Sequence, residues 1–342
     1  MKEKNSRKKI AFILPVVVIA IVSLIVFSNK GTKSAFQKDS GFIFGTSYNI
    51  TYQHSENLKN GIVEVLDSVD NSLSPFNDKS IITAVNRNED TTLDSKFTEV
   101  WTLSGKVYAD TDGAFDITVA PLVNTWGFGF KSGKMPSESQ IDSIKSFVGF
   151  NKVSLHDGKV TKQDSRTMLD CSAIAKGYAV DCVASYLIRN GVENFMVEIG
   201  GEVVTRGCNA SNKPWRIGVT KPTDDTLAVS NELQTVLEVT DIAMATSGNY
   251  RNYYIKGGKK YAHTIDPRLG VPVQHSLLSS TVFAPTCAEA DAYATSFMVM
   301  GLEKAKDVLK RNPQLTAYFI YDDGSGALKV WHSEKMKEYI AR

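Results

Sequence analysis

The fold of this chain is organised around one stretch of sequence, Cys287-Ala-Glu-Ala-Asp-Ala-Tyr-Ala-Thr-Ser-Phe-Met-Val-Met-Gly301. Its alanines and methionines favour a helix, and the glycine at its end is a typical stop signal. On such a helix Asp291 and Thr295 leave the same face, with Cβ atoms about 5–6 Å apart. A carboxylate and a hydroxyl placed in this way can bind a hard cation such as Mg²⁺. The alternative is that the threonine bonds back to a carbonyl of its own helix, beside a solvated aspartate.

The composition is that of a globular protein of 342 residues, long enough for one large domain or two ordinary ones. The formal net charge is +2, and residues 1–10 alone contain five Lys or Arg and one Glu. The remainder of the chain is therefore slightly acidic. Without an overall basic field, the sequence does not predict nucleic-acid binding.

An apolar run, Ile10 to Phe27, follows the basic end. As a helix it would be about 27 Å long, close to the hydrocarbon thickness of a bilayer. The positive-inside rule keeps residues 1–9 in the cytoplasm and exports the rest. A cleaved signal peptide is the alternative, but no small-x-small cleavage site and no lipid-acceptor cysteine follow the run. We expect a single-pass inner-membrane anchor over 10–27, a linker over 28–40, and a domain over 41–342 on the periplasmic or extracytoplasmic side.

Helical and strand patterns are mixed along residues 41–342, without the strict alternation of a doubly wound sheet, which predicts an α+β fold with mostly antiparallel strands. We expect a strand over Gly41–Gln53 with a bulge near Gly45, a strand ending at Asp170, a loop over Ala245–Asn249 and a last helix over Ser333–Ile340. The other expected helices cover 58–73, 80–86, 97–111, 137–147, a stretch ending at 190, and 302–311. The other expected strands cover 152–161 (a hairpin), 195–199, 202–208, 215–220, 234–239, 253–265 (a hairpin), 278–283 and 317–331 (a hairpin).

Common motifs for nucleotide binding and hydrolysis are missing from the sequence. Lys134 is followed by Met135, which excludes a Walker A motif, and Gly127-Phe-Gly129 lacks the third glycine of a dinucleotide fingerprint. Ser247 does not stand in a G-x-S-x-G context, and the five histidines show no zinc spacing. The four cysteines form no CxxC pair, and we expect buried free thiols.

One histidine, His263, lies beside Tyr261 and the turn at Asp266-Pro267, where a strand is expected to end. An imidazole in this position can contact an aromatic ring system or a phosphate. A structural histidine bonded to a nearby carbonyl is the alternative.

Six motifs along residues 113–295 together resemble the ApbE family of FAD:protein FMN transferases. In chain order they are Gly113-Ala-Phe-Asp116 with Pro121-Leu-Val-Asn-x-Trp-Gly-Phe-Gly129; Leu169-Asp170-x-x-Ala-Ile-Ala-Lys-Gly-Tyr-Ala-Val-Asp181; Ile199-Gly-Gly-Glu202; Ala245-Thr-Ser-Gly-Asn-Tyr250; His263-Thr-Ile-Asp-Pro-Arg-x-Gly-x-Pro272; and Ala290-Asp-Ala-x-Ala-Thr295. They occur in the family's order. The resemblance implies an ApbE-like fold over residues 41–342.

The resemblance also implies an activity, the Mg²⁺-dependent transfer of FMN from FAD to a Thr or Ser hydroxyl of a partner protein, with release of AMP. The implied metal ligands are Asp291, Thr295 and the backbone carbonyl of Ala173. The implied FAD-binding residues are Phe44, Phe76, Ala114, Phe115, Asp116, Asp170, Lys176 and His263. Phe44 and Phe76 depart from the family, which usually has Met and often Tyr or Trp at these positions; the missing lipid-acceptor cysteine is a third departure.

The residue types suit this reaction. Cleavage of a pyrophosphate requires stabilisation of negative charge, which Mg²⁺ and a lysine such as Lys176 can supply. The acceptor hydroxyl must lose a proton, and Asp291 or a metal-bound water is the nearest candidate base, although we favour Asp291 as a ligand. The family resemblance implies that the acceptor carries an S/T-G-A-T/S-type motif and is an exported or membrane redox subunit.

Two other activities remain open from the sequence: a Mg²⁺-dependent FAD pyrophosphatase that gives FMN and AMP, and a non-catalytic FAD-binding protein. Modification of the chain by itself is not expected. Asp323-Gly-Ser-Gly-Ala-Leu328 resembles the acceptor motif, but Leu328 has no hydroxyl at the acceptor position, so we predict a hairpin turn there.

Overall fold

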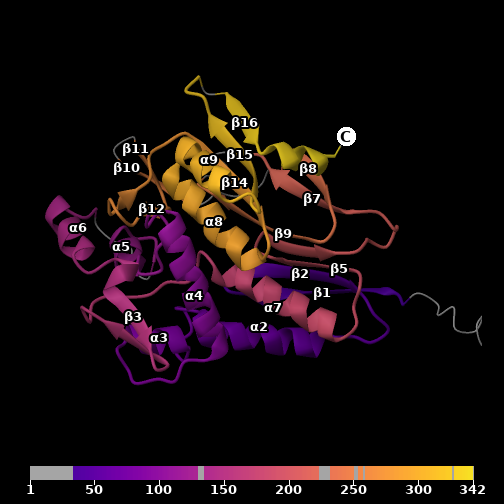
Figure 1. The fold of residues 1–342 in the computed structure, drawn as a ribbon, viewed down its shortest axis with the longest axis horizontal. Helices are drawn as coiled ribbons and strands as arrows, with labels where there is room; N and C mark the ends of the chain where they lie inside the picture. The colour runs from indigo at the N-terminus through magenta and orange to yellow at the C-terminus, as the bar shows by residue number, and fades with distance from the viewer. Residues whose placement is uncertain are drawn as a thin grey trace, which may run out of the picture.

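The computed structural model describes residues 34–129, 135–222, 232–249, 253–256, 259–325 and 327–341. Its centre is an eight-stranded antiparallel sheet with the order β1-β2-β5-β6-β9-β14-β15-β16 (Figure 1). These strands are β1 (Phe36–Ile43), β2 (Thr46–Gln53), β5 (Phe195–Ile199), β6 (Glu202–Arg206), β9 (Ile242–Gly248), β14 (Leu277–Ala284), β15 (Thr316–Asp322) and β16 (Leu328–His332). The expected α+β class with antiparallel strands is therefore confirmed.

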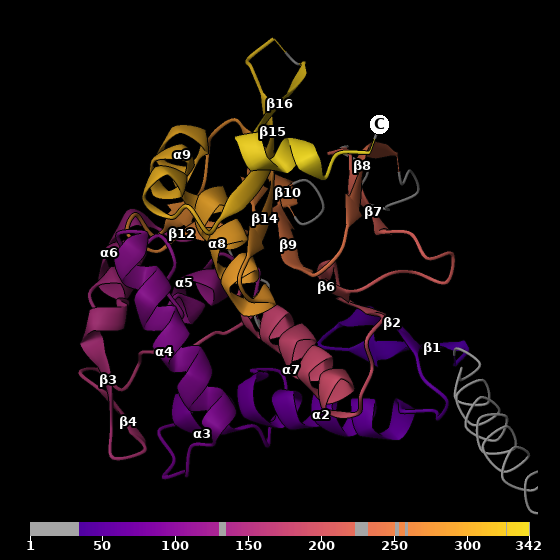
Figure 2. The same cartoon turned by 45° about the vertical axis from the view of Figure 1, so that its right-hand side comes forward.

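The helices that pack directly on one face of this sheet are α7 (Ala175–Arg189), α8 (Cys287–Met300) and α9 (Leu302–Arg311). The helices α2 (Lys59–Leu73), α3 (Ile81–Asn86) and α4 (Ser95–Asp110) pack against these helices or against one another, and α5 (Ala120–Thr125) packs against α6 (Glu138–Lys145). Figures 1 and 2 both show α7 and α8 following one another across the sheet, with α2 packed along α7. Short two-stranded pairs complete the fold: β3 (Val153–His156) with β4 (Lys159–Lys162), β7 (Trp215–Thr220) with β8 (Leu233–Val239), β10 (Tyr253–Lys256) with β11 (Lys259–Ala262), and β12 (Ile265–Asp266) with β13 (Val271–Pro272).

The sheet separates two apolar cores because strand side chains alternate between its faces. On β15, Ala317 and Phe319 belong to the core beneath the helices, whereas Tyr318 and Ile320 belong to the core on the opposite face. The β7–β8 pair and a short 3₁₀ helix, Glu334–Glu338, cover that second face. In Figure 2 the β7–β8 pair accordingly lies apart from the helices.

Helices α7 and α8 meet closely because Gly177 has no side chain at their contact. A Cβ atom at this position would lie 2.3 Å from the Cys287 carbonyl oxygen and 2.9 Å from the Ala288 nitrogen. The α7 side chain Asp181 accepts hydrogen bonds from the Cys287 and Ala288 amides, each at 2.9 Å. Since these amides are at the first turn of α8, Asp181 caps that helix from its neighbour. Helix α8 is thereby held in a defined position across the sheet.

Several expected elements differ in the structure. The single strand over Gly41–Gln53 is wrong: it is part of the β1–β2 hairpin, and its turn is Phe44-Gly45, with φ 51° and 74°. Such two-residue turns need positive φ at both positions, a requirement that Asn-Gly signals more clearly than Phe-Gly does. The loop over Ala245–Asn249 is also wrong, because Ala245 to Gly248 lie in β9. Its small side chains allow α8 to pack directly on this strand.

Two smaller differences concern the predicted strand that ends at Asp170 and the predicted last helix. No strand ends at Asp170 within the described chain, where Met168 forms one isolated bridge with Val119. The last helix is a 3₁₀ segment, Glu334–Glu338, instead of an α-helix over Ser333–Ile340. The expected helix that begins at 137 is confirmed, and Ser137 and Gln140 form a capping box at its start. The expected hairpin over 152–161 is also confirmed, with its turn at Asp157-Gly158.

The predicted anchor over 10–27 and the basic end over 1–9 lie outside the described residues, as does the first part of the linker. Across the parts of the chain that are described, no helix is both long and apolar enough to span a bilayer. All four cysteines are free, with Cys171 and Cys287 buried and Cys182 and Cys208 partly exposed.

Candidate active site

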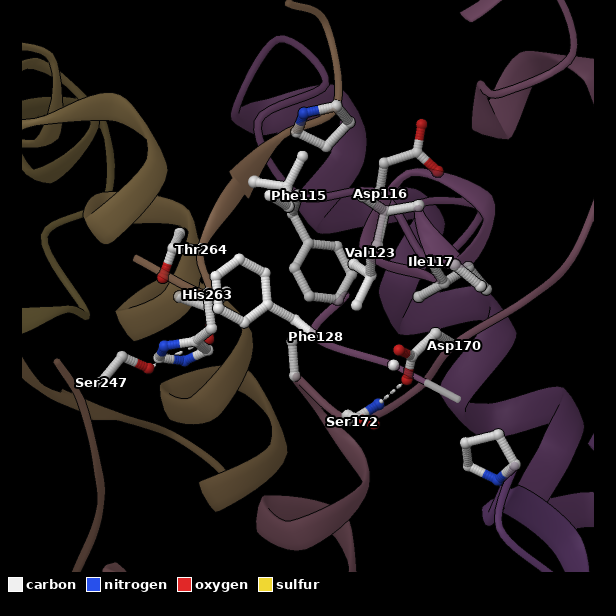
Figure 3. Close-up of a pocket in the computed structure, with 18 of the residues that line it drawn as sticks. Phe115, Asp116, Ile117, Val123, Phe128, Asp170, Ser172, Ser247, His263 and Thr264 are labelled. Carbon is white, nitrogen blue, oxygen red and sulfur yellow. Dashed lines mark hydrogen bonds between the residues drawn. The ribbon is translucent and has the colours of Figure 1, made fainter. Parts of the chain in front are cut away.

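A cavity of about 450 Å³ lies where α7, α8 and β9 meet the loops before α5 and α7 (Figure 3). Pockets of this size are typical of small-molecule sites. Ten of the eleven predicted site residues line it: Phe76, Ala114, Phe115, Asp116, Asp170, Ala173, Lys176, His263, Asp291 and Thr295. Phe44 is not among the lining residues; it is partly buried in the main core, at the turn of the β1–β2 hairpin.

At one end of the cavity a lysine lies between two buried carboxylates. The Lys176 Nζ atom is 3.3 Å from Glu202 Oε1 and 3.5 Å from Asp291 Oδ2. The Glu202 and Asp291 side chains are 3% and 2% exposed, and that of Lys176 is 26% exposed. Burial acts to lower the pKa of Lys176, but the two carboxylates outweigh it and raise that pKa above its usual value. The two carboxylates therefore stabilise the charged form of the lysine in this site.

Asp291 is held in place by α7. Its Oδ2 atom accepts a hydrogen bond of 3.1 Å from the Gly177 amide, a contact that the missing Gly177 side chain makes possible. Its Oδ1 atom accepts no hydrogen bond from the described residues. The solvated aspartate considered from the sequence is thus excluded, because Asp291 is only 1% exposed.

Thr295 also differs from the alternative considered from the sequence, a hydroxyl bonded to a carbonyl of its own helix. Its hydroxyl is 3.0 Å from the Ser247 hydroxyl of β9, whereas its neighbour Ser296 donates to the Ala292 carbonyl of the same helix. Thr295 therefore presents its hydroxyl toward β9 and the cavity.

The oxygen donors of the cavity suit a hard cation. Within the described residues, no three His, Cys, Asp or Glu side chains gather as a metal site of that kind. The donor set is instead the Asp291 carboxylate, the Thr295 hydroxyl and the backbone carbonyl of Ala173, all from residues that line the cavity. Magnesium prefers few carboxylates, with water and phosphate oxygens at its remaining positions, so these residues fit it.

The loop before α7 is fixed by two sets of hydrogen bonds. The Asn86 side chain donates to the Leu169 carbonyl and accepts from the Leu169 amide, at 2.8 and 2.7 Å. The Asp170 amide donates to the Ile117 carbonyl at 2.6 Å, and Asp170 Oδ1 accepts from the Ser172 amide at 2.8 Å. The Asp170 carboxylate is thereby oriented beside the cavity (Figure 3).

The Asp116 carboxylate lies in a different environment from that of Asp170. Its carboxylate accepts hydrogen bonds from the Thr118 amide and hydroxyl and from the Phe150 amide, and it is 7% exposed. Burial raises the pKa of Asp116 despite these donors. In Figure 3 its carboxylate is turned away from Asp170 and His263. Asp116 thus joins the loop before α5 to the chain at Phe150, and it also remains one of the residues that line the cavity.

A row of stacked aromatic rings begins at Phe128, which lines the cavity beside His263. Phe128 lies 6.5 Å from the His263 ring in an edge-on arrangement and stacks on Tyr254 at 5.2 Å. Tyr254 stacks on Tyr261 at 5.4 Å, and Tyr261 on Trp126 at 5.9 Å. Figure 3 shows the Phe128 and His263 rings beside each other at the cavity. The rings behind Phe128 support it, and a flat aromatic ligand in the cavity can pack against the Phe128 ring.

Sequence reasoning missed four residues of this site: Glu202, Ser247, Phe128 and Asn86. Glu202, Ser247 and Phe128 occur in the quoted motifs, so the motifs themselves were the available signal. A charged residue at the start of a strand is usually solvated, so no local signal marks Glu202 as buried. Ser247 lacks the G-x-S-x-G context of a nucleophile, and its position beside Thr295 arises only in the folded chain. For Asn86, no sequence signal marks the contact with Leu169.

Comparison with known proteins finds relatives over most of the chain. The ApbE family model matches residues 44–319. The FAD:protein FMN transferase of Escherichia coli strain K12 is 37% identical over 300 residues, which cover 85% of this chain and 84% of that protein. The FAD:protein FMN transferase of Vibrio cholerae serotype O1 is 33% identical over 335 residues, 95% of this chain and 98% of that one. Among solved structures, the flavin transferase ApbE from Vibrio cholerae superposes with a TM-score of 0.80 at 32% identity, covering 90% of this chain and 99% of its own.

Proposed function

Because the chain belongs to the ApbE family, we propose that it is an FAD:protein FMN transferase that needs Mg²⁺. In the proposed reaction a Thr or Ser oxygen of an acceptor protein forms a bond to the FMN phosphorus of FAD. The bond between this phosphorus and the bridging oxygen breaks, the hydroxyl proton is lost, and AMP leaves with the bridging oxygen.

The observation that carries this proposal is the joint position of three kinds of group in one cavity. Oxygen donors at Asp291 and Thr295, the Lys176 ammonium beside its carboxylates, and the Phe128 ring all border the same space. A flavin dinucleotide has a flat ring system and an anionic pyrophosphate, and these need an aromatic surface and positive charge respectively.

Each side chain then has a defined task. The Lys176 ammonium binds the anionic bridge and stabilises charge on the transferring and leaving oxygens. Asp291, Thr295 and the Ala173 carbonyl would hold Mg²⁺, which supplies further neutralisation of the phosphate charge when bound. Phe128 and His263 orient the ring system, and the fixed Asp170 carboxylate is available to a ribityl or ribose hydroxyl.

The test is incubation of the protein with FAD, Mg²⁺ and an acceptor protein that carries an S/T-G-A-T/S-type segment. Mass spectrometry should find one added FMN on the acceptor, and none on an acceptor whose last Thr is replaced by Val. Asp291→Ala should abolish labelling, whereas Asp142→Ala, which removes an exposed aspartate on α6, should not.

Two outcomes would contradict the transferase. Rapid release of FMN and AMP from FAD alone, with an unlabelled acceptor, would indicate a pyrophosphatase. FAD binding without any turnover would indicate a flavin-binding protein.

We also propose that residues 10–27 anchor the domain 41–342 at the extracytoplasmic face of the inner membrane, where it would modify exported or membrane redox subunits. The support is the apolar run behind five basic residues. In intact cells stripped of any outer membrane, external protease should digest the domain, whereas protection until lysis would place it in the cytoplasm.

A further inference from the structure

Glu202 is a buried carboxylate of the site that neither the sequence motifs nor the proposed reaction assigns a role. Its side chain is 3% exposed, and its Oε2 atom has no hydrogen-bond partner. Its Oε1 atom lies 3.3 Å from Lys176 Nζ. Burial raises the pKa of Glu202 to about 8, although the neighbouring Lys176 acts to lower it. The charged carboxylate is therefore costly in this place, so its presence calls for a functional reason.

The backbone around Glu202 is arranged to keep it buried at this place. Gly200 and Gly201 both have positive φ, 63° and 105°, at the turn between β5 and β6. A Cβ atom on Gly200 would lie 2.8 Å from the Thr46 methyl carbon and 3.4 Å from Glu202 Oε2. The glycine therefore lets the β1–β2 hairpin pack over the carboxylate, at the end of the cavity where Gly200 and Glu202 are lining residues.

The Glu202 carboxylate affects the position of the Lys176 ammonium. Lys176 Nζ is nearly equidistant from its two carboxylates, at 3.3 Å from Glu202 and 3.5 Å from Asp291. If Glu202 were neutral, the ammonium would have one buried anion as a neighbour, Asp291. It would then pair with Asp291 alone and oppose the approach of a cation to the same carboxylate.

We infer that Glu202 is a positioning residue, which holds the Lys176 ammonium between two carboxylates and so keeps Asp291 available to a divalent cation. This inference rests on the proposed function, in which Asp291 is a metal ligand. In it Glu202 acts through Lys176, and it touches neither the cation nor the transferred group.

The experiment is a double-mutant cycle with Glu202→Gln and Lys176→Met, read out as Mn²⁺ binding by electron paramagnetic resonance without FAD. Glutamine has nearly the shape of glutamate, and thermal unfolding of each variant monitors folding. In the presence of Lys176, Glu202→Gln should weaken Mn²⁺ binding tenfold or more. With Met at position 176 the same change should alter Mn²⁺ binding less than threefold, because this variant has no ammonium that could pair with Asp291 once Glu202 is replaced.

Glu198→Gln is the matched control, since Glu198 lies in β5 just before the same turn and accepts a hydrogen bond from the Gly201 amide outside the cavity lining. It should leave Mn²⁺ binding within twofold of the unaltered protein. Equal weakening by Glu202→Gln in both backgrounds would mean that Glu202 acts on the cation directly, and no weakening in either would mean that it has no part in cation binding. Either result overturns the inference.

The same variants separate this inference from the proposed function. A protein that binds Mn²⁺ with the expected coupling but labels no acceptor would retain the positioning role and refute the transferase. A protein that labels the acceptor without any coupling between Glu202 and Lys176 would support the transferase and refute the positioning role.

Discussion

Replacement of Gly177 by alanine should disrupt the contact between α7 and α8 on which the site depends. The new Cβ atom would lie 2.3 Å from the Cys287 carbonyl oxygen, where ordinary contacts begin at 3.4 Å. The two backbones must therefore separate by about 1 Å, a typical overpacking distortion that costs about 1–3 kcal/mol. The clash is with backbone atoms, which cannot rotate away as a side chain can.

Separation of the helices also weakens hydrogen bonds to two carboxylates. The Gly177 amide would move away from Asp291, and Asp181 from the first turn of α8. Hydrogen bonds to charged groups contribute about 1.5–3 kcal/mol each, and partial loss adds to the packing cost. The better helix propensity of alanine returns at most about 1 kcal/mol. We therefore expect Gly177→Ala to lower the free energy of unfolding by about 2–4 kcal/mol and to abolish Mg²⁺-dependent transfer.

The assay is equilibrium urea unfolding, followed by circular dichroism, with Gly105→Ala as the control. Gly105 is a glycine inside α4, where the nearest atom to a new Cβ is a Phe150 ring carbon at 3.0 Å, a side-chain atom and not a backbone atom. The control should therefore be destabilised clearly less than Gly177→Ala. Equal stability of Gly177→Ala and the unaltered protein would refute the close-contact reasoning.

Three other predictions concern charge and hydrogen bonding in the site. Burial raises the pKa of Asp181 to about 6, against the Ala288 and Cys287 amides that lower it. The folded state then binds more protons than the unfolded state between about pH 4 and pH 6, so this group's contribution to stability should fall as pH rises through that window. Urea unfolding at several pH values should show this slope, and Asp181→Asn should remove it; an unchanged slope would assign it to other groups. Because its two carboxylates raise the pKa of Lys176, the pH dependence of transfer should show no loss of activity from lysine deprotonation up to pH 9, and Lys176→Met should lower the rate at least 100-fold at every pH tested. Ser247→Ala removes the hydroxyl bonded to Thr295 and should raise the half-saturating Mg²⁺ concentration about three- to tenfold; an unaltered Mg²⁺ dependence would show that Thr295 needs no such support.

Local rules in the sequence determined much of the secondary structure. The capping box of Ser137 and Gln140 and the helix that ends at Gly301 both follow from neighbouring residues. The shared face of Asp291 and Thr295 follows from helical spacing alone. These features depend on residues within one or two turns of each other, which is the range over which sequence patterns act.

The tertiary structure decided which of these residues meet, and what each carboxylate does. The sequence contains Glu202 and Asp116, but nothing local indicates that Glu202 is buried against Lys176 or that Asp116 bonds to the Phe150 amide. The strand at Ala245–Gly248 also depends on distant partners, since β14 holds it in the sheet. The turn at Phe44-Gly45 joins strands that are neighbours in sequence, but its second strand, β2, is held in turn by the distant strand β5. Burial, ion pairing and close helix contact arise between segments far apart in the chain. Such contacts exist only after the chain has folded, and they determine the chemistry of the site.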